Sequence, residues 1–301
     1  MKQSTTLKSP MEVTFTWQEK LVCYAKLCRL HRPIGIFLLL WPTLWALWLA
    51  AKGIPPIHEL IVFVLGVVTM RSAGCVINDF ADRKIDGHVR RTKDRPIVAG
   101  WVSEKEALAV FGVLVVLAFL LVLSLNWLTI YMSGVAVFLA AIYPFMKRHT
   151  HLPQVFLGAA FGWAIPMAYT AIRGELSVET WILFATMLMW TVAYDTLYAM
   201  TDRADDLKIG VKSTAILFGE NDRIIVGTIQ GITILGLLML GAGLKMAWPY
   251  YTGIGVASLL FVYQHWLIRE REEGQCFKAF LNNHYVGLAI FVGIVLNYSM
   301  V

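Results

Sequence analysis

The sequence predicts an all-α membrane protein with nine transmembrane helices, and two observations carry that prediction. Hydrophobic residues make up 58% of the 301 residues and charged residues only 15%, with a mean hydropathy of +0.64. Soluble domains average about 25% charged residues. The apolar residues also form continuous blocks of about 17–25 residues, the length that a helix needs to cross about 30 Å of hydrocarbon. Both observations argue against a soluble two-domain protein.

Nine apolar blocks mark the expected spans. Only a few residues around Asn126 separate the third block from the fourth, which predicts a tight hairpin. Arg173-Gly174-Glu175 joins the fifth block to the sixth, which predicts another short turn. The expected spans are residues 34–51, 59–78, 105–124, 127–146, 153–172, 180–200, 224–244, 249–267 and 283–300. We expect them to form a single membrane domain over residues 1–301.

Positive charge is distributed unevenly between the two sides of these spans. With a cytoplasmic N-terminus, nearly all of the 26 lysines and arginines fall on the cytoplasmic side. Only Lys52, Arg173 and Lys245 fall on the opposite side, and Arg71 falls inside the second span. The positive-inside rule therefore predicts a cytoplasmic N-terminus. The polar N-terminal segment shows no signal or transit pattern, which favours a bacterial inner membrane.

Other classes of function find little support in the sequence. The pI of about 9.1 follows from the loop charges, because no basic stripe with interleaved aromatic residues predicts binding to nucleic acid. The cysteines show no paired spacing that would predict a disulfide framework or a zinc site. They are Cys23, Cys28, Cys75 and Cys276. No obligate protein partner is evident, so the expected macromolecular environment is the lipid bilayer.

Two acidic motifs begin where the two long cytoplasmic loops, about 79–104 and 201–223, are expected. Long polar loops in a compact protein are frequent sites of function. The members of each motif share one helix face if the helix continues into the loop. The first motif comprises Asn78, Asp82 and Asp86, and the second comprises Asp195, Asp202 and Asp206.

Clustered carboxylates repel one another unless a cation lies between them. Oxygen ligands without His or Cys select Mg²⁺, Mn²⁺ or Ca²⁺ over zinc, and Mg²⁺ commonly bridges carboxylates to a phosphate. Two such motifs on one side of the membrane therefore predict a clamp for a diphosphate. The alternative is a pair of solvated acidic helix ends that are neutralised by nearby Lys and Arg.

Basic residues near the motifs are candidate diphosphate contacts. Tyr143 and Lys147 lie one turn apart at the cytoplasmic end of the fourth span, and Lys147 is the preferred contact. Some of the other basic residues are expected to anchor the protein at anionic lipid headgroups. The further candidates are Arg91, Lys93 and Arg95 after the first motif, and Lys208 and Lys212 after the second.

Arg71 lies two helical turns deeper in the membrane than Asn78, on the same face. A charge at that depth is costly unless it is paired or lines a cavity. One interpretation is a structural ion pair with Asp195. The preferred interpretation is a receptor for an anionic group of the substrate.

These motifs resemble the signatures of the UbiA superfamily of intramembrane prenyltransferases, over nearly the whole chain. The matching stretches are Asn78-Asp79-x-x-Asp82-x-x-x-Asp86, Asp195-x-x-Tyr198-Ala199-x-x-Asp202-x-x-x-Asp206 and Tyr143-x-x-x-Lys147. The stretches Arg32-Pro33-Ile34-Gly35 and Leu40-Trp41-Pro42-Thr43-Leu44-Trp45-Ala46 are similar to the branch of the family that acts on 4-hydroxybenzoate.

The resemblance implies nine helices around a central cavity, capped by the two cytoplasmic loops. It implies transfer of a polyprenyl group from its diphosphate to position 3 of 4-hydroxybenzoate, in ubiquinone biosynthesis, with Mg²⁺ as cofactor. The implied Mg²⁺–diphosphate ligands are Asn78, Asp82, Asp86, Asp202 and Asp206. Tyr143 and Lys147 would assist the leaving group, Arg71 would lie near the aromatic acid, and Arg32, Arg91, Lys208 and Lys212 are further substrate-binding candidates. Asp195 is the candidate for the proton-accepting base.

Three alternatives remain open at this point. A secondary transporter also has many spans, but its polar sites are expected near the membrane midplane rather than at one face. A related prenyltransferase could use another acceptor, such as a naphthoate, homogentisate or haem. A CDP-alcohol phosphotransferase also uses acidic clusters, but it is expected to carry a denser Asp-Gly/Ala-Arg run.

Overall fold

The computed structural model describes residues 15–84, 86–88 and 92–300. Throughout these ranges the regular secondary structure is helical and no strand occurs, which confirms the predicted fold class. The α-helices are α1 (Trp17–Leu27), α2 (Ile34–Ala51), α3 (Ile57–Asp82), α4 (Glu104–Val122), α5 (Trp127–His149), α6 (Pro153–Gly162), α7 (Ala164–Arg173), α8 (Val178–Ile209), α9 (Thr214–Phe218), α10 (Asp222–Gly243), α11 (Trp248–Leu267) and α12 (Glu273–Ser299). Three short 3₁₀ helices are η1 (Asp86–His88), η2 (Gly219–Asn221) and η3 (Ile268–Glu270).

Eight helical stretches in the described residues are long and apolar enough to cross a membrane. They comprise α2, α3, α4, α5, α6 with α7, α8, α9 with α10, and α12. The eighth predicted span, residues 249–267, coincides with α11, which has 20 residues but is not one of these eight stretches. Polar side chains such as Gln264 and His265 lower its hydropathy, so the count of nine spans remains a prediction.

The turns between the spans follow from local hydrogen bonding. Asn126 begins α5 as predicted, because its Oδ1 accepts the N–H of Thr129 at 3.0 Å, while its Nδ2 donates to the carbonyl of Thr170 at 2.7 Å. Gly174 ends α7 in the left-handed conformation, with φ of 72°. Both short connections expected from the sequence are therefore present.

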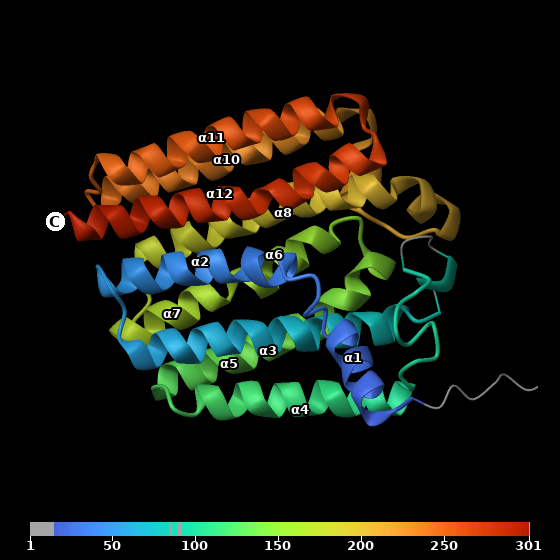
Figure 1. Ribbon diagram of the computed structural model, residues 1–301. Helices are drawn as coiled ribbons and strands as arrows, with labels where there is room; N and C mark the ends of the chain where they lie inside the picture. Colours follow the sequence, from blue (N-terminus) through green and yellow to red (C-terminus); the bar gives the residue numbers. More distant parts are fainter. Residues whose placement is uncertain (1–14, 85, 89–91, 301) are drawn as a thin grey trace, which may run out of the picture.

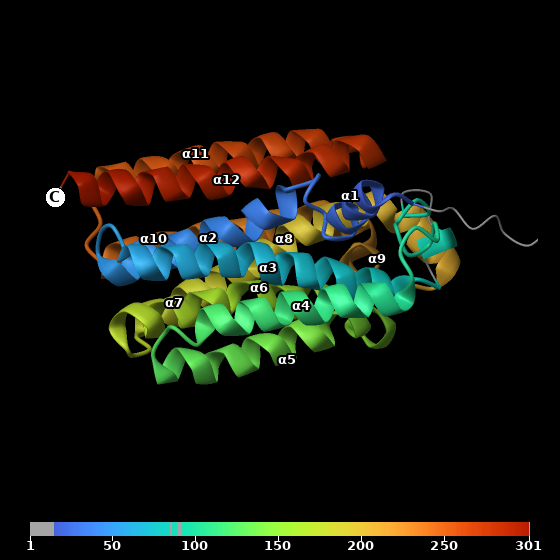
Figure 2. The ribbon, with the colours of Figure 1, turned by 60° about the horizontal axis from the view of Figure 1, so that its bottom comes forward.

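The long helices lie side by side, and their connections gather at two ends of the bundle (Figures 1 and 2). One end, the cap end, carries η1 with residues 92–103, and α9 with η2. α1 crosses the other helices near that end. Lys52, Arg173 and Lys245 follow or end helices at the opposite end, where α12 also ends. This segregation supports the orientation inferred from charge, which stays a prediction.

Aromatic side chains and close backbone contacts form the core of the bundle. Trp45 and Trp190 stack with ring centroids 5.2 Å apart, and both are fully buried. α11 and α12 touch through glycine, since a Cβ on Gly253 would lie 2.7 Å from the carbonyl oxygen of Ala289. Small residues at such contacts are typical of helix packing in membranes.

A buried polar chain also joins the last three helices. Gln230 Nε2 of α10 donates to Gln264 Oε1 of α11 at 2.9 Å, and Gln264 Nε2 donates to Asn282 Oδ1 of α12 at 3.0 Å. His265 Nε2 lies 3.0 Å from Gln230 Oε1. Gln264 and Gln230 are almost inaccessible to solvent. Each of these side chains finds its hydrogen-bond partner on another helix.

The expected extents of the two cytoplasmic loops are corrected by the structure. α3 ends at Asp82, so Asp86 lies in η1 and not on the same helix as Asn78. In contrast, α8 continues through the second motif to Ile209 and ends where Gly210 adopts a φ of 71°. Residues 201–209 are therefore helical, because no helix-breaking residue precedes Gly210.

Candidate active site

A polar cavity of about 330 Å³ lies at the cap end of the bundle, between α3, α5 and α8. It brings together most of the residues singled out from the sequence, from segments far apart in the chain. These are Arg32, Arg71, Asn78, Asp82, Asp86, Tyr143, Lys147, Asp195, Asp202, Asp206 and Lys212. The two acidic motifs therefore line one cavity, as the clamp hypothesis requires.

Among the other basic candidates, Arg95 lines this cavity, whereas Lys93 and Lys208 do not, and Lys93 is exposed. Lys208 is exposed and its Nζ lies 3.3 Å from Asp205 Oδ1. Because Lys208 follows Asp206 by two residues on a helix, it points to roughly the opposite side of α8. Arg91 lies outside the described residues.

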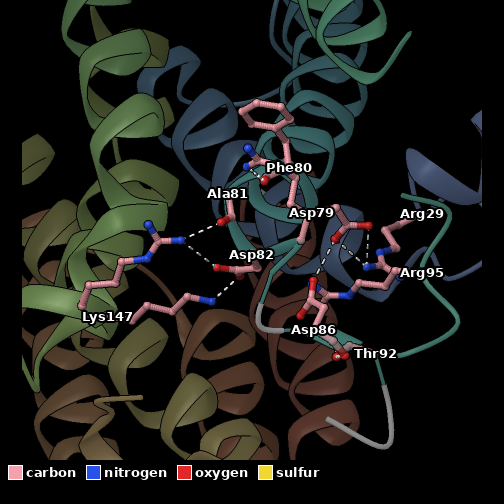
Figure 3. Close-up of polar contacts among 11 residues, drawn as sticks. Arg29, Asp79, Phe80, Ala81, Asp82, Asp86, Thr92, Arg95 and Lys147 are labelled. Atoms are coloured by element: carbon pink, nitrogen blue, oxygen red, sulfur yellow. Dashed lines mark hydrogen bonds and ion pairs between the residues drawn. The ribbon is translucent and has the colours of Figure 1, made fainter. Parts of the chain in front are cut away.

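Asp82 is the most enclosed member of the first motif, with 1% of its surface exposed. Its carboxylate accepts a hydrogen bond from Lys147 Nζ, and Arg148 Nη2 lies 3.9 Å from the same carboxylate (Figure 3). Arg148 also donates to the carbonyl of Ala81 at 2.6 Å. The sequence singled out Lys147 but not Arg148, although its position directly after Lys147 was a usable signal.

Asp86 and Asp79 share a second cationic partner (Figure 3). Arg95 Nη1 lies 2.6 Å from Asp86 Oδ2 and 3.1 Å from Asp79 Oδ1, and Arg29 Nη2 lies 2.8 Å from Asp79 Oδ1. Burial raises the pKa of Asp86 above its ordinary value, while the charge of Arg95 opposes that rise. Arg95 thus links Asp86 to Asp79 at the end of α3, and both carboxylates line the cavity.

The second motif faces the first from α8. Asp195, Asp202 and Asp206 all line the cavity, as their helical spacing predicted. Gln154 of α6 lines the cavity together with Asp195, and its Oε1 accepts the N–H of Thr214 at 3.2 Å. Gln154 was missed in the sequence because nothing in the pattern around it differs from an ordinary helix start after Pro153.

Arg71 lies deeper in the cavity and lacks the ion pair that the structural interpretation required. In the described ranges no carboxylate lies within 4.0 Å of its guanidinium nitrogens, so the predicted alternative of a direct pair with Asp195 is wrong. Its Nε is buried without a hydrogen bond, and its Cζ lies 5.6 Å from the ring centroid of Phe161. Gly35 permits this position, because a Cβ there would lie 2.4 Å from the guanidinium.

The donor set fits a hard divalent cation. Asn78, Asp82, Asp86, Asp202 and Asp206 offer only oxygen ligands, the type that Mg²⁺ prefers. In the part of the chain that the structure describes, no three acidic, His or Cys side chains already converge on a metal position. Instead Lys147 and Arg95 neutralise the first motif, and Asp82 Oδ1 remains buried without a hydrogen bond. A cation would therefore replace side-chain charges that hold the motif together.

An apolar cavity of about 420 Å³ adjoins the polar one. Arg71, Tyr143 and Phe161 line both cavities, so the two share a wall at the level of Arg71. Most of the remaining lining comes from α3, α4, α5, α6 and α7, with small residues such as Gly74 and Ala140 among them, and Leu39 of α2 and Leu125 complete it. The combined space can hold a charged head at the cap end and an apolar chain within the bundle.

Named proteins are similar to this chain in sequence. The pattern of the UbiA prenyltransferase family matches residues 39–289. The 4-hydroxybenzoate octaprenyltransferase of Photobacterium profundum is 59% identical over 281 residues, which cover 93% of this chain and 98% of that relative. The 4-hydroxybenzoate octaprenyltransferase of Aliivibrio fischeri is 60% identical over 275 residues, covering 91% and 96%.

Solved structures show the same fold at lower identity. A UbiA homologue from Aeropyrum pernix K1, in its apo form, has a TM-score of 0.77 at 23% identity and covers 89% of this chain and 98% of that one. A UbiA homologue from Archaeoglobus fulgidus, bound to GPP and Mg²⁺, has a TM-score of 0.69 at 18% identity, covering 93% and 100%. The match over residues 39–289 and the identity of 59–60% to these relatives show that this chain belongs to the UbiA prenyltransferase family, and its long apolar helices show that it is an integral membrane protein.

Proposed function

We propose that this protein transfers a polyprenyl group from polyprenyl diphosphate to position 3 of 4-hydroxybenzoate, in ubiquinone biosynthesis. The observation that carries the proposal is the polar cavity, in which two acidic motifs and Lys147 face one another beside an apolar cavity. The 4-hydroxybenzoate octaprenyltransferases at 59–60% identity support the same acceptor and an octaprenyl donor. Naphthoate, homogentisate and haem become alternative acceptors for the test below.

Asn78, Asp82, Asp86, Asp202 and Asp206 would hold Mg²⁺ with the diphosphate. Bound Mg²⁺ would supply Lewis-acid stabilisation of the charge that develops on the departing diphosphate. A UbiA homologue has been solved with GPP and Mg²⁺, and another state of it with Cd²⁺, which supports a divalent cation in the family. The choice of Mg²⁺ for this chain rests on its all-oxygen donor set.

Lys147 and Tyr143, which both line the polar cavity, would assist the leaving group. Lys147 is at hydrogen-bond distance from Asp82, so a diphosphate bound by that motif would come within reach of its ammonium group. A fixed cation aimed at the developing negative charge lowers the barrier to departure. Tyr143, one turn earlier on α5, also lines the apolar cavity and would lie beside the first carbons of a bound isoprenoid.

The apolar cavity accounts for the location of the enzyme in a membrane. It would take the isoprenoid chain and exclude water from the reacting carbon, where capture by water would compete with transfer to the ring. Aromatic side chains line the polar cavity beside it, including Tyr198 and Phe280, whose ring centroids are 4.8 Å apart. Their faces can stabilise positive charge on the allylic group.

Arg71 would bind the carboxylate of the aromatic acid. Its guanidinium is buried, has no carboxylate partner in the described ranges and lies at the junction of the two cavities. An anionic ligand there gains a charge-assisted contact and relieves an unpaired buried cation. Asp195, which lines the same cavity, is the candidate base for the ring proton.

We further propose that residues 1–301 form one membrane domain in the bacterial inner membrane, with the cap end in the cytoplasm. The charge distribution over the loops supports this orientation. Arg32 and Lys212 line the polar cavity and would attract an anionic substrate to it.

The reaction can be tested directly in native membranes with radiolabelled 4-hydroxybenzoate and octaprenyl diphosphate. We expect label in the organic phase with Mg²⁺ and none with EDTA, because diphosphate departure needs the cation. Consumption of prenyl diphosphate only with another aromatic acceptor would keep the prenyltransferase and discard 4-hydroxybenzoate. No consumption with any acceptor would contradict the proposed function and favour transport.

The proposed role of Arg71 predicts a selective defect. Arg71→Met is expected to raise the KM for 4-hydroxybenzoate by about 10–100-fold, since a charge-assisted contact to a carboxylate contributes about 1.5–3 kcal/mol. The KM for prenyl diphosphate should change much less. Steady-state kinetics with each substrate varied separately check this prediction, and equal weakening of both substrates would indicate a structural role for Arg71.

A further inference from the structure

A second ion cluster, centred on a buried carboxylate, lies next to the second acidic motif and outside the polar cavity. Asp222, the first residue of α10, has no exposed surface. Its carboxylate accepts hydrogen bonds from Arg203 Nη2 at 2.7 Å and from Arg271 Nε at 3.0 Å. Loss of either arginine would be strongly destabilising, because the buried charge of Asp222 would then be uncompensated. We call Arg203, Asp222 and Arg271 the Asp222 clasp.

The clasp joins three segments of the cap end. Arg203 also donates to the carbonyls of Ala215 and Gly219, the latter at 3.1 Å, and these residues belong to α9 and η2. Arg271 donates to the carbonyl of Glu220 at 2.7 Å and lies between α11 and α12 with a φ of 55°. The end of α8, the segment 214–221 and the turn after α11 therefore share one carboxylate.

None of the three clasp residues lines the polar cavity, but one of them is adjacent to its machinery. Arg203 follows Asp202 directly on α8. Successive residues on a helix point about 100° apart, so the side of α8 that carries Asp202 and Asp206 differs from the side that carries Arg203. Fixing Arg203 to Asp222 therefore fixes the rotation of the last turns of α8 about their axis.

We propose that Asp222 is a positioning residue for the second acidic motif. Through Arg203 it holds α8 in the rotation that directs Asp202 and Asp206 towards Asp82 and Asp86 across the cavity. This inference rests on the proposed function, since it assumes that both motifs hold one cation and one diphosphate. Residues that orient metal ligands without touching the metal typically change its affinity by about 10–100-fold.

The alternative is that the clasp only stabilises the fold. A measurement of cation affinity distinguishes this structural role from the positioning role. The experiment measures Mn²⁺ binding by electron paramagnetic resonance, with the purified full chain in detergent and geranyl diphosphate present. Asp222→Asn keeps the shape of the side chain but removes its charge. We expect it to weaken Mn²⁺ binding by about tenfold. Mg²⁺-dependent turnover should show a matching rise in the Mg²⁺ concentration at half-maximal rate.

Arg173→Met supplies the matched control at the opposite end of the bundle. Arg173 donates to the carbonyls of Ala50 and Leu49 at 2.8 and 2.9 Å, so it also joins segments through an arginine, but far from the acidic motifs. We expect this variant to lower the thermal midpoint while leaving Mn²⁺ affinity unchanged. A purely structural clasp predicts the same pattern for Asp222→Asn, and that result would overturn the proposal.

Two further variants keep the test decisive. Asp202→Asn should abolish Mn²⁺ binding in the presence of geranyl diphosphate. If wild type binds no Mn²⁺ or Asp202→Asn binds as wild type does, the proposed function fails, and the positioning role fails with it. If Asp222→Asn does not fold, Arg203→Lys replaces it, because lysine keeps the charge but loses the forked donors. A roughly threefold weakening of Mn²⁺ binding supports the proposal, and wild-type affinity overturns it.

Discussion

Replacing Asp82 or Asp202 with alanine is expected to lower kcat by about a thousandfold while the protein still inserts in the membrane. Each change removes one carboxylate from one side of the cavity, so under the proposed function the cation would lose a ligand and the diphosphate would be held less firmly. Neither residue belongs to the apolar core, which explains why insertion should survive. The measurement is turnover in membranes that contain equal amounts of each variant, determined by immunoblot.

Lys208→Ala is the control for that comparison. Lys208 is exposed on the same stretch of α8 and pairs with Asp205 outside the cavity. Exposed ion pairs contribute little, so its loss should leave kcat within about twofold of wild type. Turnover retained in both aspartate variants would remove the diphosphate clamp from the mechanism.

Lys147→Met is expected to lower kcat by about a hundredfold or more, with a smaller change in the KM for prenyl diphosphate. The substitution keeps most of the apolar length of the side chain but removes the charge beside Asp82. The effect falls on kcat because the ammonium group interacts most strongly with the charge that develops as the diphosphate departs. Steady-state kinetics at saturating 4-hydroxybenzoate measure both quantities.

Lys20→Met is the matched control for Lys147→Met. Lys20 also forms a lysine–carboxylate pair, with Glu106 at 2.9 Å, but this pair joins α1 to α4 and does not line the polar cavity. We expect its kcat to stay close to that of wild type. Similar losses in both variants would mean that Lys147 acts through structure rather than through the leaving group.

The acidic motifs were predictable because helical spacing converts directly into a shared face. On α8 this argument holds along the whole stretch from Asp195 to Asp206, since the helix continues to Ile209. The same argument fails for Asp86, because α3 ends at Asp82 and a 3₁₀ turn carries Asp86 back. Its return depends on Arg95, and no local pattern reports that contact.

Ion pairs between distant segments could not be predicted from the sequence. Arg29 reaches Asp79 from the connection between α1 and α2, 50 residues away. Arg203, Asp222 and Arg271 meet although they belong to three different segments. A single sequence shows that each residue is charged, but the choice of partner is made by the packing of the bundle. Lys208 shows the converse, since proximity in sequence to Asp206 did not bring it to the cavity.

The polar chain of Gln230, Gln264 and Asn282 has a consequence for how the protein is made. Backbone and side-chain polar groups that reach hydrocarbon without partners are costly, and α11 carries two such side chains, Gln264 and His265. α11 alone should therefore partition poorly from the translocon into lipid. Its partners lie in α10, already synthesised, and in α12, which emerges last. We expect α11 and α12 to leave the translocon together as a hairpin, so a chain that stops before α12 loses two helices from the bilayer instead of one.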